Sequence, residues 1–113
     1  MLELKSNLDP IKFLKKIEET KEKLYQSGIE NKFPDDQIEQ FKDYRRQWTI
    51  YVEKARLKHF SELVEQLKQN EADFEVGIEA INREIQEIND TVAFLDLVGR
   101  TIATLGRIVT LPI

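Results

Sequence analysis

Apolar residues near the end of the chain recur with an unbroken 4-3-4-3 spacing. The series has eleven positions, nine with a large apolar side chain and two with glycine: Phe74, Ile78, Ile81, Ile85, Ile88, Val92, Leu95, Gly99, Ile102, Gly106 and Val109. This spacing is typical of the a and d positions of a coiled coil. It predicts a helix over about 71–108 whose apolar stripe must be buried against other helices.

The beginning of the chain carries the signals of a shorter helix. Asp9 is suited to an N-cap, and Pro10 follows at the first helical position, where its missing N–H costs nothing. A helical stripe then follows with Ile11, Leu14, Ile17 and Leu24, and Gly28 is suited to the left-handed residue after a helix end. These features predict a helix over about 10–27.

The middle of the chain predicts a long second helix over about 35–69, which contains no glycine or proline. Its apolar positions are Ile38, Phe41, Tyr44, Trp48, Tyr51, Val52, Ala55, Phe60, Leu63, Val64 and Leu67. A strict heptad repeat from Ile38 places Arg45 and His59 in the apolar stripe. The repeat is therefore expected to slip near residues 56–60.

The connection at Gln69-Asn70-Glu71 decides the predicted topology. Asn70 can cap a new helix, which favours a turn and an antiparallel hairpin, and a continuous helix through this point is the alternative. The predicted fold class is all-α: one helical domain over 1–113, built as a long, coiled-coil-like antiparallel hairpin with the shorter N-terminal helix against its open end. This three-helix arrangement places the aromatic residues of the second helix beside Val92–Val109.

The last part of the chain, residues 92–113, is strongly apolar, but Asp96, Arg100 and Arg107 interrupt it. Charges at these positions argue against a membrane-spanning helix. Three interpretations of this segment compete. A core helix is favoured over a homo-oligomer interface, in which Gly99 and Gly106 would let backbones approach, and over insertion at a membrane surface.

Composition narrows the choice of partner and compartment. Charged residues make up 34% of the chain, and the net charge of −4 disfavours nucleic acid as the main partner. One basic and aromatic group resembles a nucleic-acid surface in composition: Lys42, Tyr44, Arg45, Arg46, Trp48, Tyr51, Lys54, Arg56 and Lys58. The chain has no cysteine, and its first residues do not have the pattern of a signal peptide, so a cytoplasmic location is expected.

Residues suited to catalysis are scarce. His59 is the only histidine, and the His59–Glu62 pair on a charged helix is expected to be an ordinary surface pair. No phosphate-binding glycine loop and no nucleophile motif occur in the sequence. We expect no enzymatic activity, no cofactor, no metal and no small-molecule substrate.

The sequence therefore predicts a non-enzymatic interaction or assembly module that binds protein, either a second copy of itself or another helical partner. The residues expected at the partner interface are Phe60, Leu63, Leu67, Phe74, Ile78, Ile81, Phe94, Leu97, Leu105 and Ile108. The alternative is a membrane-surface or pore-assembly component that uses residues 92–111.

Overall fold

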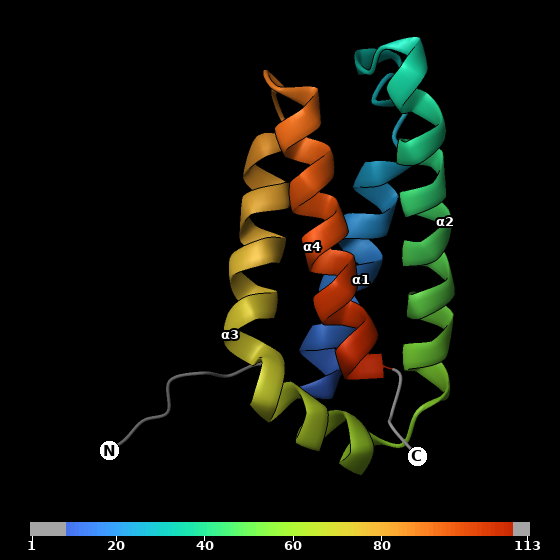
Figure 1. Ribbon diagram of the computed structural model, residues 1–113. Helices are drawn as coiled ribbons and strands as arrows, with labels where there is room; N and C mark the ends of the chain where they lie inside the picture. The colour runs from blue at the N-terminus through green and yellow to red at the C-terminus, as the bar shows by residue number, and fades with distance from the viewer. Residues whose placement is uncertain (1–8, 110–113) are drawn as a thin grey trace.

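The computed structural model describes residues 9–109, which form four α-helices and one short 3₁₀ helix (Figure 1). These elements are α1 (Pro10–Leu24), η1 (Glu30–Lys32), α2 (Asp35–Leu57), α3 (Phe60–Glu84) and α4 (Thr91–Val109). The described part of the chain contains no strand. The predicted all-α class is confirmed, whereas the predicted arrangement of three helices differs from the four that are found.

The four helices pack as a bundle in which α4 lies between α3 and α2, while α1 contacts the same two helices from behind (Figure 1). Successive helices run in opposite directions, so α1 is parallel to α3 and α2 is parallel to α4. Polar contacts fix the α1–α3 register: Lys16 Nζ lies 3.0 Å from Glu75 Oε1, and Lys23 Nζ lies 2.7 Å from Asn82 Oδ1. Both contacts join residues separated by 59 positions, as two parallel helices in a constant register require.

The start of α1 follows the capping signal. The Asp9 side chain accepts a hydrogen bond of 2.8 Å from the Lys12 N–H, and Pro10 occupies the first helical position. The helix ends at Leu24, three residues before the predicted end at 27. Gly28 has a positive φ of 93°, but it lies in the connection before η1 and not directly after the helix.

The predicted helix over 35–69 is divided in two. It ends at Leu57, because Lys58 and His59 adopt extended conformations with ψ of 150° and 145°. This break falls where the heptad repeat slips. By ending the helix there, the chain places His59 in an exposed connection, so no histidine enters the apolar stripe.

The turn predicted at 69–71 is wrong, because α3 passes through these residues without interruption. The side chain of Asn70 donates a hydrogen bond of 2.9 Å to the Gln66 carbonyl one turn earlier. Asn70 therefore lies within a helix and does not cap one. Here local propensity for a cap is overruled by the continuous apolar stripe of α3.

The reversal occurs instead between Glu84 and Thr91, inside the segment for which the repeat predicted one continuous helix. Asp90 begins α4: its carboxylate accepts a hydrogen bond of 3.0 Å from the Ala93 N–H. Ile85 is buried and Ile88 packs against the core from within this connection. Ile85 and Ile88 thus continue the 4-3 spacing through the turn, and for this reason the sequence pattern does not reveal it, although Val92, the next residue of the series, is 63% exposed.

All four helices contribute to one hydrophobic core. Phe13 of α1 packs on Phe74 of α3 with ring centroids 5.1 Å apart. Near η1, Phe33 stacks on Phe41 of α2 at 4.4 Å and meets Phe94 of α4 at 6.2 Å. This core covers the apolar side of α4 and leaves a narrow strip of that helix on the surface.

Candidate functional site

The residues predicted at a partner interface lie mainly in the core of the single chain. Eight of them are buried: Leu63, Leu67, Phe74, Ile78, Ile81, Phe94, Leu105 and Ile108. Leu97 is partly buried, and the side chain of Phe60 lies outside the described part of the structure. These buried residues hold the bundle together. The chain has one more helix than predicted, so the helices that cover these residues belong to the same chain. In the folded chain, these residues are therefore not free to form a docking surface.

Tyrosine side chains of α2 fill the space beside the two glycines of α4. A Cβ atom built on Gly99 would lie 2.8 Å from Tyr44 Oη, and one built on Gly106 would lie 3.2 Å from Tyr51 Oη. The two tyrosines are seven residues apart, and so are the two glycines. This equal spacing is what the parallel packing of α2 and α4 requires. The predicted proximity of these aromatic residues to Val92–Val109 is found. The glycines, which we considered as sites for another protomer, serve this internal contact.

After its first turn, where Val92 and Ala93 are also exposed, the exposed surface of α4 is a narrow ridge with one small and three charged residues. Asp96, Arg100, Ala103 and Arg107 are all exposed, and their spacing of 4, 3 and 4 places them on one helical face. We call these four residues the α4 ridge. Arg100 is bound to Asp96 at 2.8 Å, and both side chains are more than half exposed. The ridge therefore has charged residues at both ends, with Arg100 and the small residue Ala103 between them.

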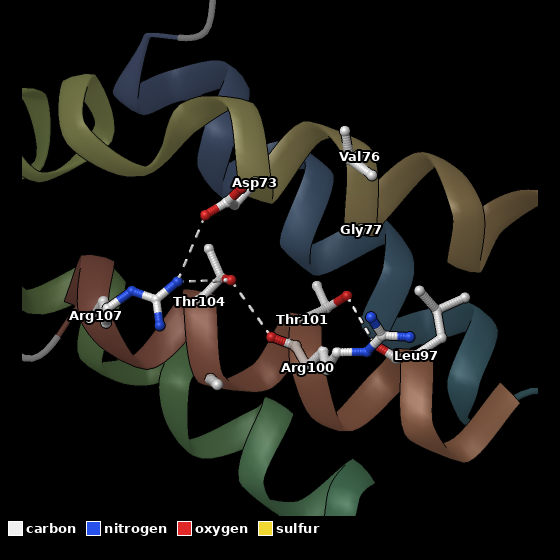
Figure 2. A pocket seen from close by; sticks show the side chains of 9 residues that line it. Asp73, Val76, Gly77, Leu97, Arg100, Thr101, Thr104 and Arg107 are labelled. Carbon is white, nitrogen blue, oxygen red and sulfur yellow. Dashed lines mark hydrogen bonds and ion pairs between the residues drawn. The ribbon is translucent and has the colours of Figure 1, made fainter. Parts of the chain in front are cut away.

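A groove of about 540 Å³ lies on one side of the α4 ridge, between α3 and α4 (Figure 2). Its floor includes Gly77 of α3 and Thr101 of α4, and Val76, which is 69% exposed, lines its edge. Arg107 reaches across the groove, with its Nη2 atom 3.8 Å from Asp73 Oδ2 and 3.1 Å from Thr104 Oγ1. The groove therefore combines small residues, an exposed valine and loosely held charges.

A second, shallower groove of about 410 Å³ lies on the other side of the ridge, between α4 and α2. Tyr44, Tyr51, Gly99 and Ile102 line it, and Arg100 and Ala103 line both grooves. The surface formed by α3, α4 and α2 thus presents one ridge between two grooves. A surface with a ridge between two grooves is suited to the packing of a further helix, because side chains of one helix fit between rows of side chains on another.

The basic and aromatic group of α2 is largely engaged inside the chain. Trp48 is fully buried, and its Nε1–H donates a hydrogen bond of 2.9 Å to the Ile17 carbonyl. Arg45 binds Glu30, and Arg56 binds Glu18. The hydrogen bond with Glu18 raises the pKa of the Arg56 guanidinium above its usual value. Trp48 is therefore not available for stacking on bases, and four of the six cations of this group form ion pairs: Lys42, Arg45, Arg46 and Arg56.

Groups suited to metal or acid–base chemistry do not converge within residues 9–109. No set of three or more histidine, cysteine, aspartate or glutamate side chains there is placed to hold a metal ion. His59 lies at the exposed start of α3, where its carbonyl accepts from the Glu62 N–H at 3.1 Å. Also in this described part, no helix combines the length and apolar character needed to cross a bilayer.

Sequence reasoning missed two parts of this surface, the grooves on either side of the ridge and the exposure of Val76. The charged residues Asp96, Arg100 and Arg107 did indicate the exposed side of α4. Val76 lies outside the 4-3 series, at a position between Phe74 and Ile78 that faces away from the core. An apolar residue at such a position was the available signal.

Comparisons of the chain with protein-family models, with curated proteins and with solved structures found no match. The class of protein is therefore defined by the described residues alone. They form a bundle of four α-helices in which the most apolar helix carries a ridge between two grooves.

Proposed function

We propose that this protein is a non-enzymatic helical interaction module that binds a helix of another protomer or protein through the surface formed by α3, α4 and α2. The observation that carries this proposal is the α4 ridge between its two grooves. A helix laid along this surface would place its side chains in the grooves and contact Ala103 closely, as in other helix-in-groove interfaces.

The burial of the apolar residues of α4 supports a protein partner over a membrane. The apolar residues Phe94, Leu105 and Ile108 of α4 are buried, so insertion at a membrane surface would require this helix to leave the bundle. Residues 110 and 111, which belong to the segment considered for membrane binding, lie outside the described residues. Cosedimentation with anionic liposomes tests that alternative, because an interaction module of this kind stays in the supernatant.

The proposal is tested by site-specific photo-crosslinking in an extract of the cells that produce the protein. A photoreactive amino acid replaces Ala103 in one variant, and Lys15, which is exposed on α1, in a matched control. We expect specific adducts at Ala103 that are absent at Lys15, and hydrogen exchange on the purified complex should then show protection of α4. Equal labelling at both positions, or no adduct at Ala103, would overturn the proposal.

A further inference from the structure

Two residues of the α4 ridge, Asp96 and Arg107, carry opposite charges and lie at equal distances from its midpoint between Arg100 and Ala103. Along the helix the order is Asp96, Arg100, Ala103 and Arg107. A second copy of this helix can be placed antiparallel to the first, in the register that centres both on the midpoint between Arg100 and Ala103. In this register Asp96 faces Arg107, and Arg100 faces Ala103. Each such pair occurs twice, because the arrangement has two-fold symmetry.

We propose that the α4 ridge is a homodimer interface, in which a second copy of this chain packs with its α4 antiparallel to the first. The two-fold axis then passes between Arg100 and Ala103. Two symmetric ion pairs form between Asp96 of one protomer and Arg107 of the other, about 16 Å apart along α4, since a helix rises 1.5 Å per residue. This inference rests on the proposed function and names the partner.

The present ion pairs of these residues oppose the dimer only weakly. Asp96 and Arg100 form an exposed pair within one helix turn. Arg107, which is about half exposed, lies 3.8 Å from Asp73 and donates hydrogen bonds to Asn70 Oδ1 at 3.2 Å and Thr104 Oγ1 at 3.1 Å. Exposed pairs of this kind contribute little free energy, because water screens the charges and the side chains stay mobile. Exchange of these partners for equivalent ones on a second protomer therefore costs little free energy.

A separate observation on α3 supports the same axis. Val76 is exposed and adjacent to Gly77, which lies against Thr101, so Val76 is at the level of the proposed two-fold axis. In an antiparallel dimer joined face to face, the α3–α4 groove of one protomer lies opposite the same groove of the other. The two Val76 side chains would then approach each other and become buried, whereas in the single chain they remain in water.

The first experiment uses disulfide trapping, because the chain has no cysteine of its own. An Ala103→Cys variant should form a disulfide-linked dimer under mild oxidation, since the two thiols lie close to the axis. A Val92→Cys variant is the matched control: it is exposed on the same helix, but the antiparallel arrangement separates its two copies by about 28 Å along the axis. Efficient linkage of Val92→Cys would overturn the antiparallel proposal, because only parallel helices bring these positions together.

The second experiment uses charge exchange with sedimentation velocity from micromolar to submillimolar concentrations. Asp96→Arg should weaken dimer formation by about tenfold or more, since it places like charges together at two symmetric places. The double variant Asp96→Arg with Arg107→Asp should restore the wild-type dimer. A wild-type chain that stays monomeric throughout the range, or a double variant no better than the single one, would overturn the proposal. If the wild type is monomeric while the Ala103 photo-crosslink still captures another protein, the proposed function stands and only the homodimer is lost.

Discussion

Gly77 of α3 lies directly against Thr101 of α4, and this contact sets how closely the two helices approach. A Cβ atom added to Gly77 would lie 2.3 Å from Thr101 Oγ1 and 3.1 Å from its Cγ2. Thr101 is itself held in place, because its hydroxyl donates a hydrogen bond of 2.9 Å to the Leu97 carbonyl. The two residues therefore fit only because one of them has no side chain.

Gly77→Ala should destabilise the protein. Alanine is favoured over glycine within a helix by about 1 kcal/mol. Overpacking against Thr101 costs up to about 3 kcal/mol, and we expect a net loss of about 1–2 kcal/mol in the free energy of unfolding. Urea denaturation followed by far-UV circular dichroism measures the change. The double variant Gly77→Ala with Thr101→Ala should recover much of the loss, because the clashing atoms are gone.

Gly106→Ala is the matched control for this prediction. Its added Cβ would meet Tyr51 Oη at 3.2 Å, and that atom is the end of a side chain that can move. We expect its free energy of unfolding to stay within about 1 kcal/mol of the wild type, because the gain in helix propensity offsets a small shift of the ring. Equal stability of the Gly77→Ala and Gly106→Ala variants would contradict the proposed close approach of α3 and α4.

Trp48→Phe should destabilise the core. The substitution removes the hydrogen bond from the indole to the Ile17 carbonyl and leaves a smaller ring in a fully buried position. We expect a loss of about 2 kcal/mol from the missing hydrogen bond and the cavity together. Trp48 is the only tryptophan, so the fluorescence of the wild-type protein reports burial of this one side chain. Its emission should shift to longer wavelength when the bundle unfolds.

The control for Trp48→Phe is Tyr25→Phe, which also alters a polar aromatic side chain. Tyr25 is 47% exposed, and its hydroxyl accepts a hydrogen bond from Thr49 at the surface. We expect its stability to stay within about 0.5 kcal/mol of the wild type. A tryptophan emission typical of full solvent exposure in the native protein would show that α1 and α2 do not pack as described.

The sequence predicted the composition of the core better than the path of the chain. Ile78, Ile81 and Leu95 of the 4-3 series are buried, because apolar spacing determines which face of a helix must leave water. The position of the turn was not predictable from that spacing. Ile85 and Ile88 continue the series through the connection, so the pattern does not distinguish one long helix from two antiparallel ones.

The sequence contains two local signals for a helix start, and only one of them coincides with a helix start in the structure. The sequence Asn89-Asp90-Thr91 has the composition of a helix start, and Asp90 does cap α4. The similar signal at Asn70 lies within a helix. Only tertiary packing decides between them, because a reversal at 85–90 lets α3 and α4 bury each other. The candidate surface was hidden for the same reason: it consists of what remains exposed after that packing.

Arg45 should be more important for stability than a typical surface arginine. Its Nη2 atom lies 2.7 Å from Glu30 Oε1, its guanidinium lies 4.6 Å from the Tyr25 ring and 4.9 Å from the Phe41 ring, and its side chain is only 13% exposed. Arg45 therefore links η1 and the end of α1 to α2. We expect Arg45→Gln to lower the free energy of unfolding by about 1–2 kcal/mol in chemical denaturation.

Arg46→Gln provides the comparison for Arg45, because it alters the neighbouring arginine on the same helix. Arg46 binds Asp43 one turn away, and both side chains are more than half exposed. The expected loss is within about 0.5 kcal/mol, since exposed ion pairs contribute little. If both variants lose the same stability, the contacts of Arg45 with Glu30 and the two rings have no special weight.

Asp90→Ala should weaken the start of α4 and with it the reversal that the repeat pattern conceals. The Asp90 carboxylate accepts from the Ala93 N–H at 3.0 Å, and its carbonyl accepts from the Phe94 N–H at 2.9 Å. Alanine removes the first of these bonds and a favourable charge at the helix start, for a loss of about 1 kcal/mol. Native-state hydrogen exchange should show faster exchange in the first turn of α4, while α1 amides stay unchanged. Asn89→Ala, an exposed neighbour, should leave these amides as they are. Unchanged protection in Asp90→Ala would contradict a stabilising role of this cap at the start of α4.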